Sequence, residues 1–277
     1  MFIFSAKVVL AIIIKELKIL KRHPLQLFYE LLLPFAKSFP AILLGKYLMD
    51  NNGAGSFSQT TGTDNSVLFL GLSILFTIFI DIQEQVGFYL EREMWMGTLE
   101  QLWITPVKKI GLIGGWITFA TIKAVIYGLA ACSLLFIFTA NGIETIMNAN
   151  FTLFFIVFVL LLLTSISNGI FISEISLRFR QSDSIIYFIT FLIPVLSGVA
   201  YPIEVFPKAI RVISLLLPTT YAYDLMRHSL LNTYTIFELR VELIILIVLI
   251  LIHMFVAIKL FDSLVKRLEK WGTIYLK

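Results

Sequence analysis

The sequence predicts an all-α integral membrane protein with six transmembrane helices. Hydrophobic residues make up 58% of its 277 residues and charged residues only 14%, and the mean hydropathy is +0.91. A soluble fold of this length cannot bury so much apolar surface, so lipid must cover the remainder. In addition, six apolar stretches reach the ~20 residues needed to cross the ~30 Å hydrocarbon core of a bilayer. The expected spans are Leu25–Leu48, Val67–Phe88, Ile110–Thr139, Phe151–Ser173, Ser184–Tyr201 and Val241–Phe261.

These spans predict a single transmembrane domain over residues 1–277. We expect an interfacial elbow helix (1–23), a six-span bundle (24–265) and a cytoplasmic tail (266–277). Basic residues concentrate in the flanks of both termini and in the loops after the second and fourth expected spans. Because cytoplasmic loops are enriched in Lys and Arg, both termini are expected in the cytoplasm.

The first 22 residues predict an amphipathic helix that lies in the headgroup layer. Basic residues fall along one stripe of this helix: Lys7, Lys15, Lys18 and Arg22. Such a helix directs its basic face toward anionic lipid. The segment lacks the small-residue cleavage site of a signal peptide, and His23-Pro24 ends it because proline disfavours helix in the preceding residue. The alternative is that the segment begins a long first span, which its cations make costly.

The stretch Pro202–Glu238 predicts short helices on or in the outer leaflet. Prolines divide it into apolar segments that are too short to cross a membrane and that contain charges. We expect Tyr221 and Tyr223 at the interface, where aromatic side chains concentrate. A plain external loop is the alternative. Asp50–Ser66 has no apolar periodicity and predicts a flexible external loop.

Several functional classes are excluded by what the sequence lacks. The only cysteine, Cys132, lies within the third expected span, which argues against a disulfide framework or a cysteine metal site. A net charge of +4 is too small to indicate nucleic-acid binding. Gly45-Lys46 is followed by Tyr47, whereas an ATP-binding Walker A loop requires Ser or Thr after the lysine. An intramembrane protease or transferase would need paired catalytic groups at one depth, and no such pair is evident.

A charged segment follows the second expected span and reads EREMWMGTLEQLW (residues 91–103). It predicts a short amphipathic rod, Met94–Thr105, that Pro106 ends. On a helix, one face is apolar and consists of Trp95, Leu99, Leu102 and Trp103. Glu93, Gly97 and Glu100 share another face, which is acidic. The acidic face should be offered to a protein partner, since anionic headgroups would repel it. A solvated loop is the alternative.

This segment resembles the signature of the permease subunits of ABC-2 type transporters. The matching residues are Glu91, Arg92, Glu93, Gly97, Thr98, Glu100, Leu102, Thr105 and Pro106. A second resemblance, to the Pro-x-x-Tyr…Arg segment before the last span, lies at Pro218–Tyr221 with Asp224 and Arg227. The elbow helix, the six spans and the internal termini are similar to that family as well.

The resemblance implies a function and partners. It identifies residues 91–106, including Leu99, as the coupling helix that docks on a separate ATP-binding cassette ATPase, present in two copies. ATP and magnesium would be held by that ATPase, with no cofactor in this chain. A second copy of this permease, or a homologue, and membrane lipids would complete the assembly. The expected activity is drug- or multidrug-type export across a prokaryotic cell membrane.

Ionisable residues within the spans are candidates for the substrate pathway. Lys37 and Lys123 are expected at similar depths, ~18 and ~20 Å from the cytoplasmic side at 1.5 Å per residue. With Asp81 as the single nearby acid, they favour a site for an anionic headgroup. The alternatives are that Lys37 pairs with Asp81, or that each lysine reaches toward the membrane surface. His253 fits a hydrogen-bonded core residue better than a ligand.

Three functional hypotheses follow. The favoured one is an export permease for a hydrophobic or amphiphilic compound such as a drug, a lipid or a lipid-linked glycan, with polysaccharide export less favoured. The second, an intramembrane enzyme, lacks the paired catalytic groups that it would need. The third is a membrane anchor or immunity protein that sequesters a ligand without turnover.

Overall fold

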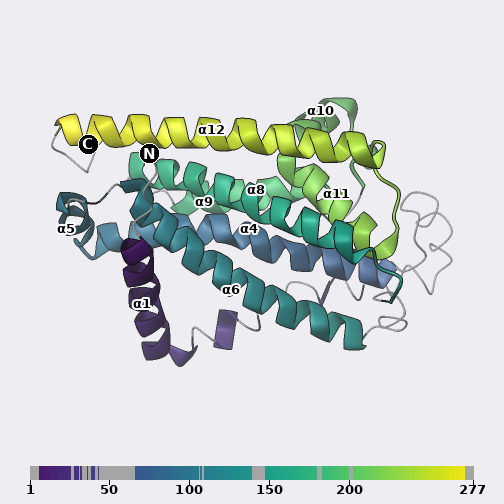
Figure 1. The fold of residues 1–277 in the computed structure, drawn as a ribbon, viewed down its shortest axis with the longest axis horizontal. Helices are drawn as coiled ribbons and strands as arrows, with labels where there is room; N and C mark the ends of the chain where they lie inside the picture. The colour runs from purple at the N-terminus through teal and green to yellow at the C-terminus, as the bar shows by residue number, and fades with distance from the viewer. Residues whose placement is uncertain are drawn as a thin grey trace.

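The computed structural model describes residues 6–25, 66–105, 107, 109–138, 147–179, 183–199 and 202–271, with scattered residues between 28 and 43. Within them the regular elements are all helical. These helices are α1 (Ala6–Arg22), α4 (Ser66–Trp95), α5 (Leu99–Ile104), α6 (Lys109–Phe138), α8 (Phe151–Arg178), α9 (Asp183–Leu196), the short 3-10 helix η1 (Ile203–Val205), α10 (Lys208–Leu216), α11 (Pro218–Leu231) and α12 (Leu239–Trp271). The long helices form one elongated bundle, and α1 lies beside α6 near one end of it, at a steep angle to the long helices (Figure 1).

Among the described residues, three helices are long and apolar enough to cross a membrane: Lys109–Ala131 in α6, Phe151–Arg178 in α8 and Leu239–Leu268 in α12. Two shorter apolar helices are Val67–Phe79 in α4 and Asp183–Leu196 in α9. Large apolar side chains of α12 lie on the surface, among them Leu251, Ile252 and Phe255. Such a surface is stable where lipid covers it. The prediction of an all-α membrane protein is confirmed, and the count of six spans stays a prediction.

The expected span boundaries are correct in part. The expected span Ile110–Thr139 corresponds to α6 within one residue at each end. However, α4, α8 and α12 each continue past the expected end of their apolar stretch, to Trp95, Arg178 and Trp271. Hydropathy locates only the part of a helix that lipid favours, whereas backbone hydrogen bonding continues until a helix-breaking residue intervenes. The expected span Leu25–Leu48 and the expected loop Asp50–Ser66 lie mostly outside the described residues.

The centre of the bundle is built on α4 and α8, which pack against each other, with α6, α11 and α12 around them. Phe79 of α4 and Phe158 of α8 meet edge to face, with ring centroids 5.1 Å apart and an interplanar angle of 88°. The helix α1 packs against α6, where Ile12 lies over Gly115. A Cβ atom at Gly115 would come within 2.5 Å of Ile12 Cδ1, so this close approach needs glycine.

The fifth expected span, Ser184–Tyr201, is wrong in its extent. Helix α9 ends at Leu196 and contains Pro194, and Gly198 follows with a φ of +69°. Beyond it, α10 and α11 confirm that Pro202–Glu238 contains short helices. The helix α10 lies at the end of the bundle opposite α5 (Figure 1). The expected interfacial position of Tyr221 and Tyr223 is wrong, because α11 packs against α8 and α12 and both tyrosines are buried.

Candidate functional site

The charged motif of residues 91–105 begins on α4 and continues through a tight turn into α5. Gly97 has a φ of +65°, a conformation that glycine adopts without strain. The amide of Thr98 donates to the carbonyl of Glu93 (3.0 Å) and that of Gly97 to Met94 (3.1 Å). This is the Schellman pattern that ends helices at a glycine. The expected continuous rod Met94–Thr105 is therefore wrong: α4 stops at Trp95, and a separate short helix begins at Leu99.

The turn also separates residues that were expected to share a face. Glu93 is only 2% exposed, whereas Glu100 on α5 is open to solvent. Leu99 is fully buried, whereas Trp95 is 76% exposed. The predicted acidic face of Glu93 and Glu100, and the predicted apolar face of Trp95 with Leu99, are both wrong, because the left-handed residue at Gly97 redirects the chain between them.

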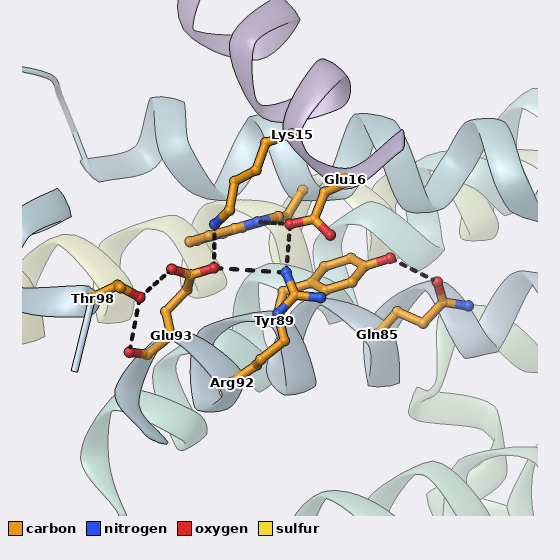
Figure 2. A network of polar contacts seen from close by, with 8 residues as sticks. Lys15, Glu16, Gln85, Tyr89, Arg92, Glu93 and Thr98 are labelled. Atoms are coloured by element: carbon orange, nitrogen blue, oxygen red, sulfur yellow. Dashed lines mark hydrogen bonds and ion pairs between the residues drawn. The ribbon is translucent and has the colours of Figure 1, made fainter. Parts of the chain in front are cut away.

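Glu93 and Arg92 belong to a polar junction that joins α1, α4 and α6. We define the polar junction as Lys15, Glu16, Arg92, Glu93, Thr98 and Trp116. Lys15 donates to the Glu93 carboxylate, and the Thr98 hydroxyl donates to its other oxygen (2.6 Å). Arg92 donates to Glu16 (2.6 Å), and the indole of Trp116 donates to the same Glu16 oxygen (3.2 Å). Figure 2 shows Lys15 and Glu16 reaching from α1 to Glu93 and Arg92 on α4.

The electrostatics of the junction keep Glu93 ionised. Burial by itself raises the pKa of Glu93. The hydrogen bonds from Lys15 and Thr98 and the charge of Arg92 together lower it by more, so the pKa lies below its ordinary value. Arg92 also lies over the ring of Tyr89, with its guanidinium carbon 5.2 Å from the centroid. The cation and the anion on α1 (Lys15 and Glu16) thus pair with the anion and the cation on α4 (Glu93 and Arg92). Glu91, the remaining acid of the motif, is buried as well.

The exposed part of the motif is mainly apolar. Trp95, Met96 and Ile104 are 76%, 64% and 84% exposed, and Glu100 is the exposed acid among them. We call these four residues the docking patch. Behind it, Leu99, Leu102 and Trp103 pack against the hydrophobic core. Lys109 donates to the carbonyls of Trp103 and Thr105 and so caps the end of α5. Pro106 lies outside the described residues.

A family profile described as ABC-2 type transporter matches residues 7–231. The chain belongs to the ABC-2 type transporter family. The match contains α1, the polar junction, the docking patch and α11, and it ends before α12. A search of curated proteins finds no match. The chain is therefore the membrane-embedded permease subunit of an ABC transporter, a class of protein that works with an ATP-binding cassette partner.

The second motif of the permease holds the break after α9. Arg227 on α11 donates to the carbonyl oxygen of Gly198 (2.9 Å) and pairs with Asp224 (3.3 Å). Its guanidinium carbon lies 4.7 Å from the ring centroid of Phe69. Pro218 occupies the first turn of α11, where its missing N–H costs nothing.

Hydroxyl groups of α11 reinforce the same contact. The Tyr221 hydroxyl donates to the carbonyl of Leu215 (2.9 Å), and that of Thr220 donates to Ser214 (2.6 Å). These bonds satisfy carbonyl groups at the end of α10, so α11 fastens the broken fifth span and α10 into one unit. Asp224 also accepts from the amide of Ile236 (3.1 Å) and thereby fixes the loop before α12.

The predicted substrate-pathway residues are described by the structure only in part. Lys123 is buried and pairs with Glu30 (2.6 Å), an acid that is not among the predicted site residues. The role of Lys123 in holding an anionic headgroup stays a prediction. Asp81 is half-buried on α4, and Lys37 lies outside the described residues.

His253 is half-buried on α12 and contacts α8. Its Nδ1 lies 3.1 Å from the Ser167 hydroxyl, and its ring centroid is 6.2 Å from that of Phe171. Among the residues that the structure describes, no group of three or more His, Cys, Asp or Glu side chains is arranged to hold a metal ion.

Proposed function

We propose that this permease exports a hydrophobic or amphiphilic compound, such as a drug, a lipid or a lipid-linked glycan, using ATP hydrolysed by a separate subunit. The observation that supports this most directly is the docking patch on a firmly held base at the end of α4. ATP and magnesium belong to the partner subunit, which we expect in two copies. A second copy of this permease, or a homologue, completes the pathway.

The docking patch has the composition of a protein-binding surface. Aromatic residues and Met are enriched at interfaces, and Trp in particular often provides much of the binding energy. Trp95 and Met96 lie at the turn, and Glu100 and Ile104 lie four residues apart on α5, where they share a face. An apolar surface with one carboxylate replaces the acidic face that the sequence alone predicted. The partner should therefore offer an apolar groove with a basic residue at its edge.

The polar junction provides a route by which movement of the partner reaches the bundle. A displacement of α5 acts directly on α4 through the tight turn at Gly97. It acts on α1 through Lys15 and Glu16, and on α6 through Trp116. Rearrangement of a packed bundle needs such connections, because packed elements shift between discrete arrangements as units.

We also propose that the permease is a multi-pass protein of a prokaryotic cell membrane with both termini in the cytoplasm. The last turn of α12 and α5 lie at the same end of the bundle (Figure 1). The exposed basic residues Lys266 and Arg267 at that end agree with a cytoplasmic location.

Binding of the ATPase tests this function. We expect the variant Trp95→Ala/Ile104→Ala to bind the ATPase subunit at least about tenfold more weakly, because interface anchors each contribute more than about 1 kcal/mol. In nanodiscs that contain this variant, transported compounds should no longer stimulate ATP hydrolysis by the ATPase subunit. Glu100→Lys should weaken binding in the same way if the partner offers a basic residue.

Val212→Ala/Leu216→Ala provides a matched control, because these side chains are also exposed and apolar but lie on α10 at the opposite end of the bundle. Equal effects of the two double variants would refute the docking role. A non-transporting anchor would bind a ligand without any effect on ATP hydrolysis, and this outcome would favour that alternative. Stimulation by polysaccharide precursors alone would favour polysaccharide export.

A further inference from the structure

The helix α1 presents two different faces. One face is directed into the protein, where Ile12 and Glu16 are buried against α6 and α4. The opposite face is exposed along the whole length of the helix. Its residues are Lys7, Leu10, Ala11, Ile14, Leu17, Lys18, Lys21 and Arg22.

The exposed residues form two adjacent strips. At 3.6 residues per turn, Leu10, Ile14 and Leu17 follow one edge of the exposed face. Lys7, Lys18 and Arg22 follow the other edge, whereas Lys21 falls within the apolar strip, at the last turn of the helix. The outer face of a surface helix in water is mainly charged and polar. An apolar strip beside a basic strip is the pattern of a helix that lies at a membrane surface.

The position of α1 agrees with this pattern. The helices of membrane length run along the bundle, whereas α1 lies beside α6 near one end and runs at a steep angle to them (Figure 1). A helix at a steep angle to membrane-spanning helices, near their ends, runs along the bilayer at the boundary between acyl chains and headgroups. Lys15 is held by Glu93, so it is the other four cations that face outward.

We propose that the outer face of α1 is a docking surface for anionic phospholipids of the surrounding bilayer. Lys7, Lys18, Lys21 and Arg22 bind the phosphate-bearing headgroups, and Leu10, Ile14 and Leu17 contact the acyl chains. Charge complementarity selects anionic over zwitterionic lipid, because a zwitterionic headgroup offers no net negative charge to these cations.

The same turns of α1 hold the polar junction on their other face. Lys18 and Arg22 follow Glu16 within two turns, so lipid that holds α1 also limits the movement of Glu16 against Arg92. Anionic lipid should therefore raise the ATPase coupling of the assembled transporter. This second step rests on the proposed function, whereas lipid docking does not.

Lipid quenching in nanodiscs tests the docking step on the full-length permease alone. Ala11, exposed beside the basic strip, is replaced by Cys in a Cys132→Ser background and labelled with a fluorophore. Brominated phosphatidylglycerol should quench this label more strongly than brominated phosphatidylcholine at equal mole fraction. In Lys18→Gln/Lys21→Gln the preference should fall, by about fivefold for each cation removed. Raising the salt concentration should lower it too.

Lys266→Gln/Arg267→Gln is the matched control, because it removes two exposed cations from α12 and leaves α1 intact. Equal quenching by the two lipids in the wild type, or the same loss of preference in the α12 variant, would overturn the proposal. Equal quenching together with weaker ATPase binding by Lys18→Gln/Lys21→Gln would show that the basic strip serves a protein instead. The quenching measurements contain no ATPase, so failure of the proposed function cannot change the quenching by either lipid.

In the assembled transporter, ATP hydrolysis should rise with the phosphatidylglycerol fraction for the wild type and not for Lys18→Gln/Lys21→Gln. A normal lipid preference with no response of ATP hydrolysis would overturn the coupling step and leave the docking step in place.

Discussion

Replacing Glu93 by glutamine separates a structural role for this residue from a role in docking. The variant removes the negative charge that Lys15 and Thr98 hydrogen-bond and keeps one acceptor oxygen. Hydrogen bonds that involve a charged group contribute about 1.5–3 kcal/mol. Lys15 is 39% exposed, so solvent screening favours the lower end, and we expect a loss of about 1.5 kcal/mol.

Thermal unfolding of the purified permease in detergent measures this loss. A change of 1 kcal/mol shifts Tm by about 2–4 °C in proteins of this size class, so Glu93→Gln should lower Tm by about 3–6 °C. Glu100→Gln is the control, because the Glu100 side chain is exposed, and such substitutions change stability by about 0.5 kcal/mol or less. The two glutamates would behave alike if both served only as docking residues.

A double-mutant cycle with Lys15 tests the pairing itself. Lys15→Met and Glu93→Gln together should lose about 1 kcal/mol less than the sum of the two single variants, as residues in direct contact do. Additive losses, or a Tm of Glu93→Gln equal to that of Glu100→Gln, would refute the reasoning from the polar junction.

Two further predictions follow from buried charges. Because the Glu93 pKa is lowered, its stabilisation is complete above its ordinary pKa of 4.5 and is lost as the pH falls through its lower folded-state value. The Tm difference between wild type and Glu93→Gln should thus stay constant from pH 7 to 5 and shrink below pH 4.5; an unchanged difference at pH 3 would contradict this. Arg227→Met should cost about 3–5 kcal/mol, because it leaves Asp224 buried without its cation. Arg211→Met, which breaks only the exposed pair with Glu204, should cost less than about 1 kcal/mol; similar Tm losses would contradict the role of Arg227.

The end of α4 at Gly97 has a signal in the sequence, but projecting the residues onto one continuous helix conceals it. The helical periodicity of the residues around Gly97 predicts that it lies inside a helix. Glycine after a helical stretch is also the common signal for a helix end, and here it occupies that position. By contrast, the pairing of Glu30 with Lys123 has no signal in the sequence, because the two residues lie far apart in the chain.

The sequence by itself determined that this protein is a helical membrane permease, because apolar stretches of bilayer length and a local charged motif are properties of neighbouring residues. It also located α1 and its end before His23, since amphipathic periodicity and proline act within a few residues. Only the tertiary structure decided which acids of the motif are available to a partner. Glu93 is removed from the surface by Lys15, 78 residues away in the chain, and Glu100 stays outside because the turn at Gly97 points α5 in another direction. Burial and pairing of charges depend on which helices meet, and no local pattern contains that information.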